Sequence, residues 1–233
     1  MTKQSATSPL KLEDFREEHP MVETARMYLK NFSAVMGLVV LSLIVVISLI
    51  GPFIYSTDPF EMVWAPFTKP GDQGFILGTD YLGRDLLAQI IHGGKVTLAV
   101  GCAAALLSVF IGITIGALSG FYRGWVEEVL MRITEFFQVL PTLLFSMVIV
   151  ALFGASLPVI TFAIGIVSWT AVARITRAEF LRIRELEYVT ASRSVGAKNI
   201  YLITQVILPN ALPPIVVQAT LMVGSAILFE AGL

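Results

Sequence analysis

Few residues of this sequence have the type and spacing that enzyme chemistry requires. Residues 93–95, Gly-Gly-Lys, resemble the end of a phosphate-binding loop, but Gln89 occupies the position of its first glycine and Val96 that of its Ser or Thr. The sequence contains no Gly-x-Ser-x-Gly motif, no cluster of metal ligands and no paired carboxylates in an apolar segment. His92 lacks a second ligand at metal-binding spacing, which favours an interfacial histidine. We therefore expect a protein that is not an enzyme, with no catalytic, cofactor-binding or metal site of its own.

The composition explains why such residues are scarce. Of the 233 residues, 56% are hydrophobic and 14% are charged, and the mean hydropathy is +0.80. Soluble proteins carry about 25% charged residues, and a soluble domain of this size could not bury so much apolar surface. Soluble enzymes, disordered chains and basic nucleic-acid binders are excluded, and the net charge of −1 gives nucleic acid no electrostatic basis as a partner.

Four long stretches without a charged residue predict the membrane-spanning helices. They contain 27, 27, 38 and 31 residues, and a helix needs about 20 apolar residues to cross the bilayer core. The 38-residue stretch is divided at Gly154 and Pro158, which end one helix and open the next. Pro141 either kinks the third span or begins it. The five predicted spans are 32–55, 96–122, 136–153, 157–173 and 213–233, with a short helix after Asp85 ahead of the second.

The positions of Lys and Arg predict the orientation. Segment 1–31 contains five of them, loop 56–93 two, loop 123–135 two and loop 174–198 six. This asymmetry places the N-terminus in the cytoplasm. The first span is too long and too far from the start for a secretory signal, so we expect it to be retained.

Three features within the apolar segments have structural explanations. Gly112, Gly116 and Gly120 recur every four residues, which favours close helix packing over a lining of a translocation path. Cys102 is expected to be a small buried hydrophobic residue. Glu230 is expected to have a polar packing or interfacial role rather than a contact with substrate or protons.

The two longest loops are candidate binding surfaces. Residues 178–194 favour a helix, Gly196 interrupts it, a short amphipathic segment follows over 197–205, and Pro209 ends that segment. This loop either binds a cytoplasmic partner or serves only as a basic segment that fixes the orientation of the neighbouring spans. Its arginines, Arg182, Arg184 and Arg193, would each add at most about 1 kcal/mol.

Loop 56–95 is polar and is expected outside the cytoplasm. Gly78 and Gly83 are typical of turns, and Asp85 is typical of a helix start. The loop is either a solvated connection or a docking surface for a soluble partner. The docking interpretation names Asp80, Gly83, Arg84 and Asp85.

Motifs in both loops resemble those of a known family. Residues 187–196, Glu-Tyr-Val-Thr-Ala-Ser-Arg-Ser-Val-Gly, followed after nine residues by Val-Ile-Leu-Pro at 206–209, resemble the "EAA" loop of ABC-importer permeases. Thr190, Ser192 and Val206 depart from that pattern. Residues 77–85 and 210–214 narrow the resemblance to the second, C-type permease of dipeptide, oligopeptide and nickel importers.

The resemblance implies a type I ABC-importer permease fold over residues 32–233, after a cytoplasmic segment 1–31, in a bacterial inner membrane. It implies an ATPase-coupling loop over 174–210 and an extracytoplasmic loop over 56–95. The residues it assigns to coupling are Glu187, Thr190, Ala191, Ser192, Gly196, Ala197, Lys198, Leu208 and Pro209.

The resemblance also implies the partners: a second, non-identical permease, two ATPase subunits that carry ATP and Mg, an extracytoplasmic substrate-binding protein and the lipid bilayer. Family members have a sixth span, so this chain is expected to be truncated at its C-terminus. The predicted function is translocation of peptides as half of the transmembrane pathway. The alternatives are a nickel or other small-solute importer, an ATP-independent secondary transporter, and a membrane scaffold without transport.

Overall fold

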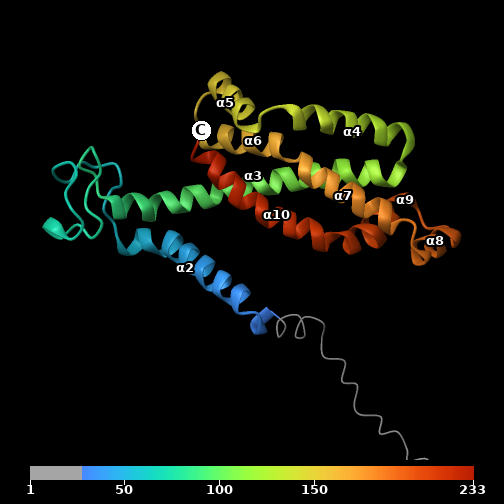
Figure 1. Cartoon of the computed structure of the whole chain (residues 1–233), viewed down its shortest axis with the longest axis horizontal. Helices are drawn as coiled ribbons and strands as arrows, with labels where there is room; N and C mark the ends of the chain where they lie inside the picture. The colour runs from blue at the N-terminus through green and yellow to red at the C-terminus, as the bar shows by residue number, and fades with distance from the viewer. Residues whose placement is uncertain (1–27) are drawn as a thin grey trace, which may run out of the picture. The chain divides into compact units, whose positions relative to one another are not determined.

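The computed structural model describes residues 28–233, and these residues are mostly helical apart from the loop between Ile54 and Leu86 (Figure 1). Within them, extended pairing is limited to two isolated bridges, Met62 with Arg84 and Thr79 with Asp85. The predicted all-α class is confirmed over this range, whereas most of the predicted segment 1–31 lies outside it. The chain divides into two units, Met1–Ser56 and Thr57–Leu233, which are described separately.

The described part of the first unit is built around helix α2, Phe32–Ile54. Asn31 begins the helix, because its side-chain oxygen accepts a hydrogen bond from the N–H of Ala34 at 3.3 Å. Large apolar side chains are exposed along its whole length. A helix that is apolar on every side is typical of a membrane span. Its bounds agree with the predicted span 32–55 to within one residue.

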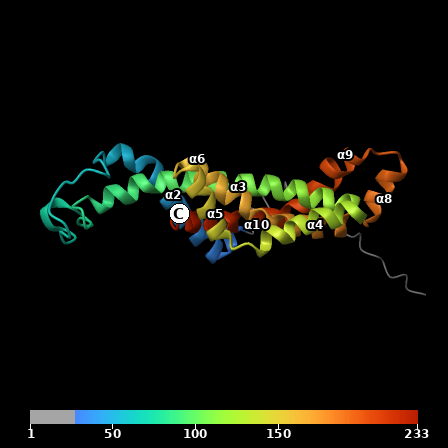
Figure 2. The same cartoon turned by 90° about the horizontal axis from the view of Figure 1, so that it is seen from above.

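The second unit is a bundle around the long helix α3, Leu86–Tyr122 (Figures 1 and 2). Four helices pack along α3: α4 (Gly124–Val139), α6 (Leu157–Ser168), α7 (Thr170–Ile183) and α10 (Leu208–Glu230). Helix α5, Thr142–Phe153, packs on α6. The remaining elements are the short 3-10 helix η1 (Asp72–Gly74), α8 (Glu187–Ser194), α9 (Asn199–Tyr201) and the π-helix η2 (Leu202–Ile207).

Helix α3 corrects the predicted second span, 96–122. It begins at Leu86 and continues through residues 93–95 without a break. The carboxylate of Asp85 begins it by accepting hydrogen bonds from the N–H groups of Leu87 at 2.8 Å and Ala88 at 3.4 Å. The two glycines do not end the helix because each costs only about 1 kcal/mol in a helix interior. The separate short helix predicted after Asp85 is therefore the first part of α3.

The predicted third and fourth spans, 136–153 and 157–173, have incorrect bounds. Helix α4 occupies the region predicted as a loop, and it meets α5 at an angle of 85°. Pro141 is the residue that begins α5, and it also lies at this bend, so both alternatives left open for it stay compatible with the structure. Helices α6 and α7 likewise meet at 41° and extend the helical region to Ile183.

Pro209 does not end a helix, and the prediction that it does is wrong. Residues 199–230 are helical throughout, with Pro209, Pro213 and Pro214 inside or at the start of α10. Each proline removes one backbone donor. Beside Pro209, the side-chain amide of Asn210 donates to the carbonyl of Val206 at 2.7 Å.

Several described helices are suited to a membrane. By length and composition, three can cross it: α2, α3 and the run Asn199–Glu230. The count rises to five if each bent pair forms one span. The chain therefore has the helices of a multi-pass membrane protein, and the number five stays a prediction.

Helices α3 and α7 approach closely along a line of glycines, which are Gly112, Gly116 and Gly120. A Cβ atom at Gly116 would lie 2.4 Å from the carbonyl oxygen of Ala173 and 2.6 Å from the Cβ of Thr176. At the other two glycines it would lie 2.6 Å from the Cβ of the facing α7 residue. Any side chain larger than hydrogen would therefore push the two backbones apart.

Two other residues of the apolar segments have defined positions in the bundle. Glu230 accepts a hydrogen bond from the hydroxyl of Thr97 at 3.1 Å, which connects α10 to α3. Cys102 is exposed, and the prediction that it is buried is wrong. Its neighbours Gly101 and Ala104 lie on the buried face of α3, and Cys102 lies on another face.

Candidate functional site

A backbone bend follows helix α8 at one end of the bundle. Gly196 has a φ of +87°. The N–H of Gly196 donates to the carbonyl of Arg193 at 3.0 Å, and the N–H of Ala197 donates to that of Ser192 at 3.2 Å. This pair of bonds is the Schellman pattern, which needs a left-handed residue where Gly196 lies. Any other L-residue would cost roughly 1–2 kcal/mol in that conformation. The predicted glycine bend is therefore present.

One side of α8 is anchored in the bundle core. Val189 is fully buried and belongs to the same hydrophobic cluster as Leu202, Ile203 and Ile207 of η2. A movement of α8 would therefore be transmitted through packed side chains to η2, and through η2 to α10, which follows it directly.

Four large apolar side chains of α8, the bend and α9 are exposed. We call this surface the α8 face, and it consists of Tyr188, Val195, Ile200 and Tyr201. Val195 is 87% exposed and Ile200 is 66% exposed. Large apolar side chains gathered on an exposed surface are typical of a protein contact.

The coupling residues named from the sequence surround this face. Six of them are exposed, namely Glu187, Thr190, Ala191, Gly196, Lys198 and Pro209. The other three, Ser192, Ala197 and Leu208, are half-buried. The hydroxyl of Ser192 donates to the carbonyl of Tyr188 at 2.8 Å, so it is engaged within the helix. Their role in coupling stays a prediction.

The arginines of this region differ in what they contact. Arg182 is exposed and pairs locally with Glu179, which lies three residues before it on the same helix. Arg184 is largely buried and donates to the carbonyl of Phe121 at 2.6 Å and to that of Gly120 at 3.4 Å. A cation on the last carbonyls of a helix satisfies unpaired acceptors and complements the helix dipole. The expectation of at most about 1 kcal/mol assumed an exposed arginine, and it is revised for Arg184 because this side chain is largely buried.

We expect Arg184→Ala to destabilise the chain by about 1.5–3 kcal/mol, because hydrogen bonds from a charged donor to the end of α3 are lost. Arg182→Ala is the matched control, with an expected change below about 1 kcal/mol for an exposed local pair. The measurement is the thermal unfolding midpoint of each variant in detergent. Equal midpoints for the two variants would contradict the assignment.

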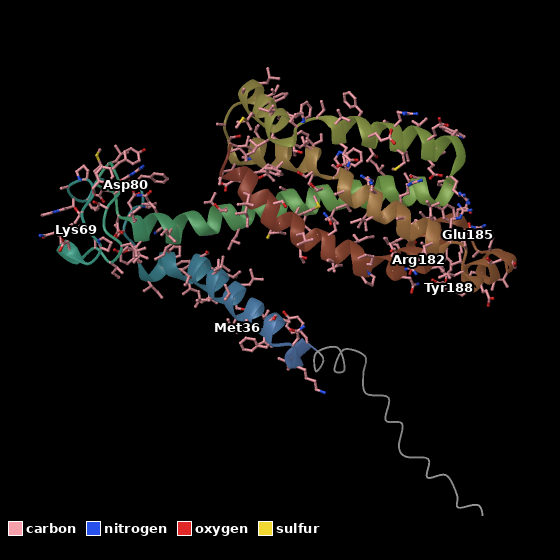
Figure 3. The ribbon with its side chains drawn as sticks, viewed as in Figure 1. Met36, Lys69, Asp80, Arg182, Glu185 and Tyr188 are labelled. Atoms are coloured by element: carbon pink, nitrogen blue, oxygen red, sulfur yellow. The ribbon has the colours of Figure 1, made fainter. Side chains whose placement is uncertain are left out.

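The loop 57–85 lies at the opposite end of α3 from α8, as Lys69 and Asp80 on one side and Glu185 and Tyr188 on the other make visible (Figure 3). Asp80 organises this loop. Its carboxylate accepts hydrogen bonds from the N–H groups of Leu82 at 2.8 Å and Arg84 at 2.9 Å, from Arg84 Nε at 2.8 Å and from Gln89 Nε2 at 3.1 Å. Burial raises the pKa of Asp80, but these hydrogen bonds outweigh it and lower the pKa to about 2.

Close backbone contacts complete the loop. A Cβ atom at Gly83 would lie 2.0 Å from the carbonyl oxygen of Trp64, and Gly83 also has a φ of +77°. Thr79 is buried, donates to the carbonyl of Ala65 at 2.7 Å and accepts from the N–H of Thr68 at 2.9 Å. The loop is therefore a folded structure held by side-chain and backbone hydrogen bonds.

The residues proposed for docking are inside this structure. Asp80, Gly83 and Asp85 are buried, and Arg84 is half-buried. The exposed residues of the loop include instead six large apolar side chains: Phe60, Met62, Trp64, Phe67, Ile76 and Tyr81. The four motif residues shape the loop, and docking at the loop stays a prediction.

We expect Asp80→Asn to open the loop, because a neutral amide is a weaker acceptor for Arg84 and the backbone N–H groups. The measurement is the rate of chymotrypsin cleavage within residues 57–85 at pH 7, with Asp72→Asn, an exposed acid of the same loop, as control. The pKa of Asp80 is lowered from 3.8 to about 2, so its stabilising effect is complete above about pH 4 and is lost as pH falls toward 2. Pepsin cleavage of the wild-type loop should rise over that window. Equal chymotrypsin rates for the two variants would show that Asp80 does not hold the loop.

Residues 112–233, more than half of the chain, match the family described as "Binding-protein-dependent transport system inner membrane component". The chain belongs to this family. Residues 20–70 match the "N-terminal TM domain of oligopeptide transport permease C". The predicted resemblance to a C-type permease of ABC importers is thereby confirmed.

Similar permeases occur in several bacteria. The chain is 39% identical over 220 residues to the di/tripeptide transport system permease protein DppC of Pseudomonas aeruginosa, covering 92% of this chain and 73% of the relative. It is 34% identical to the dipeptide transport system permease protein DppC of Haemophilus influenzae, over 92% and 75% of the two chains. The identity to the dipeptide permease DppC of Bacillus subtilis is 37%, over 88% and 64%.

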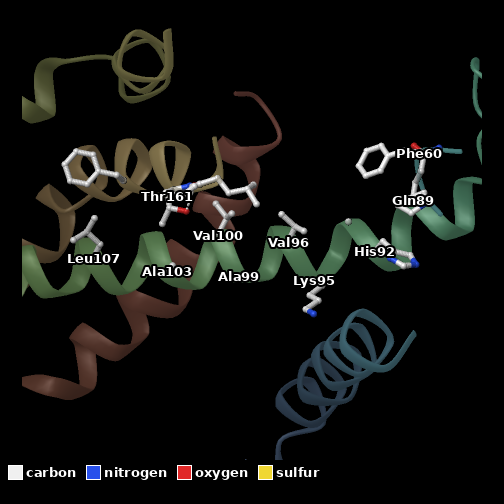
Figure 4. Close-up of a pocket in the computed structure, with 15 residues that line it drawn as sticks. Phe60, Gln89, His92, Lys95, Val96, Ala99, Val100, Ala103, Leu107 and Thr161 are labelled. Carbon is white, nitrogen blue, oxygen red and sulfur yellow. Dashed lines mark hydrogen bonds between the residues drawn. The ribbon is translucent and has the colours of Figure 1, made fainter. Parts of the chain in front are cut away.

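Sequence reasoning missed two features of this permease. The first is the π-helix η2, and π-helical turns are frequent at functional sites. The second is a groove of about 1060 Å³ between the first half of α3 and the start of α6 (Figure 4). Its walls include Val96, Val100, Leu107 and Thr161, and its loop end includes Gln89 and His92. Among the described residues no three His, Cys, Asp or Glu side chains form a possible metal site.

Proposed function

We propose that this permease forms half of the translocation pathway of an ATP-driven peptide importer. The observation that supports the substrate class is the identity of 34–39% to permeases named for dipeptides and tripeptides, over most of the chain. The chain itself hydrolyses no ATP in this proposal. ATP and Mg are bound by two separate ATPase subunits.

In the proposed topology the N-terminus and α8 lie in the cytoplasm, and the loop 57–85 lies outside. The excess of Lys and Arg in segments 1–31 and 174–198 supports this orientation. The separation of α8 and the loop at opposite ends of the bundle agrees with it. Each bent helix pair then forms one span, which gives five spans in an inner membrane.

A labelling experiment tests this topology. Single cysteines replace Ile76, 62% exposed in the loop, and Val195, 87% exposed beside α8, in a Cys102→Ser background. A membrane-impermeant thiol reagent added to intact spheroplasts should modify the cysteine at 76 and leave the one at 195 unmodified. The reverse pattern would overturn the orientation.

The proposed complex has four core subunits: this chain, a second and different permease, and two ATPase subunits. The ATPase contacts the α8 face, and its closure moves α8, η2 and α10 together. The shared core of Val189 with η2 supports this path of movement. An extracytoplasmic binding protein delivers substrate at the loop 57–85.

Reconstitution tests the proposed function. The complex is purified under mild conditions, its subunits are weighed, and it is placed in liposomes with its binding protein. We expect ATP-dependent uptake of a labelled dipeptide, with nickel as the comparison solute. A stable homodimer without ATPase, or uptake of nickel without uptake of peptide, would contradict the proposal.

A further inference from the structure

Helix α4 presents three different faces along its length. Thr134 is buried, and Phe137 packs on the ring of Trp169 with the ring centroids 5.6 Å apart, so this face lies against the bundle. A second face is exposed and apolar and includes Val129, Ile133 and Phe136. The third face is exposed and charged.

The charged face is a stripe at helical spacing. Glu128, Arg132 and Glu135 follow one another at intervals of four and three residues, which places them on one side of α4. The side chain of Arg132 is 77% exposed and that of Glu135 is 63% exposed. Gln138 extends the stripe toward α7 by accepting a hydrogen bond from Arg174 at 3.2 Å. We call the α4 residues Glu128, Arg132, Glu135 and Gln138, together with Arg174 of α7, the polar stripe.

A surface groove lies at one end of the polar stripe. It has a volume of about 290 Å³ and is lined by Glu127, Glu128, Arg132, Glu135 and Arg177, among others. Arg177 of α7 donates to Glu127 at 2.8 Å through Nε and also forms an ion pair with it. This pair fixes α4 against α7 and leaves the stripe beside it exposed.

With α3 as a membrane span, the level of Arg132 and Glu135 along it falls within the bilayer core. Arg177 packs where α3 carries Gly116 and Gly120, and α4 returns along α3 from that level (Figure 1). With a rise of about 1.5 Å per residue, Glu135 lies about 12 Å from Glu127 along the helix. The uncharged part of α3 between Lys95 and Arg123 is about 40 Å long, and the bilayer core is about 30 Å thick.

Wherever the bilayer core is placed along the uncharged part of α3, it includes the level at which Arg132 and Glu135 of α4 lie beside α3. Exposed charges at this depth cannot face lipid without a large cost, and charged residues in spans almost always face a bundle interior or a water-filled cavity. The apolar face with Val129, Ile133 and Phe136 is suited to lipid instead.

We propose that the polar stripe is this chain's wall of the aqueous translocation pathway, where it contacts the charged groups of a transported peptide. Because the stripe carries carboxylates and guanidinium groups, it offers partners to both the ammonium and the carboxylate ends of a peptide. This inference rests on the proposed peptide-import function.

Neighbouring residues of α4 give matched probes at equal depth. Single cysteines replace Glu135 and Arg132 on the stripe, and Phe136 and Ile133 on the apolar face, in a Cys102→Ser background. Each variant is assembled into the complete importer in membrane vesicles and treated with a charged thiol reagent, with and without a dipeptide. The stripe cysteines should react at least about tenfold faster than their neighbours, because the reactive thiolate forms in water and not in hydrocarbon. The dipeptide should slow that reaction.

Equal reaction rates at both faces, or unreactive stripe cysteines, would overturn the proposal. Unreactive stripe cysteines would indicate that a partner subunit covers the stripe. The result is separable from the proposed function. Fast labelling of the stripe that no dipeptide slows, together with the absence of peptide uptake by the unmodified importer, would contradict both the inference and the proposed peptide substrate. Unreactive stripe cysteines with normal peptide uptake would refute the inference alone.

Discussion

Gly196→Glu is expected to leave the permease inserted in the membrane and to abolish uptake. A glutamate cannot adopt the φ of +87° at this position without a cost of roughly 1–2 kcal/mol. Nothing within the chain lies within 4 Å of a Cβ placed there, so the bundle itself tolerates the side chain. The new carboxylate points into the space beside the α8 face, where the ATPase is proposed to dock.

Gly154→Glu is the matched control for this variant. Gly154 has a φ of +92° and also has open space around it, but it lies in the turn between α5 and α6. Both variants therefore carry backbone strain, which is the larger at Gly154 because its φ of 92° and ψ of 149° lie in a region that essentially only glycine adopts, and only Gly196→Glu carries the strain next to α8. The measurements are peptide uptake and ATPase co-purification. Uptake in Gly196→Glu equal to that in the control would remove the coupling role from this bend.

Gly116→Leu is expected to prevent stable folding of the bundle. Its Cβ atom alone would lie 2.4 Å from a backbone oxygen of α7, and overpacking of a tight interface costs about 1–3 kcal/mol or more. Gly93→Leu is the control on the same helix, because nothing lies within 4 Å of its Cβ. We expect the thermal midpoint in detergent to fall sharply for the first variant and little for the second. A similar midpoint for both would show that α3 and α7 can separate without cost.

The sequence predicted the features that depend on local chemistry. The bend at Gly196 was predictable because a glycine between two helical segments favours a left-handed conformation. The first span was predictable because α2 is apolar on every side. The family was recognised from motifs whose spacing is specific.

The sequence analysis was wrong where helices depend on their neighbours. Residues 123–135 were predicted as a loop because they carry charges, yet the spacing of Glu128, Arg132 and Glu135 is that of one helix face, and this signal was available. Pro209 was interpreted as a helix terminator, although residues 199–230 are helical throughout and α10 packs on the bundle. The burial of Asp80 and Asp85 depends on loop contacts that no spacing reveals.

The most direct test of the account is cross-linking at the α8 face. A photoreactive amino acid is placed at Ile200, 66% exposed, and for comparison at Ile76 in the loop at the other end of α3. The assembled importer is irradiated, and the adducts are identified by mass. The account predicts an adduct between position 200 and an ATPase subunit and none between position 76 and that subunit. An ATPase adduct at position 76, or its absence at position 200 in a complex that transports peptide, would contradict the account.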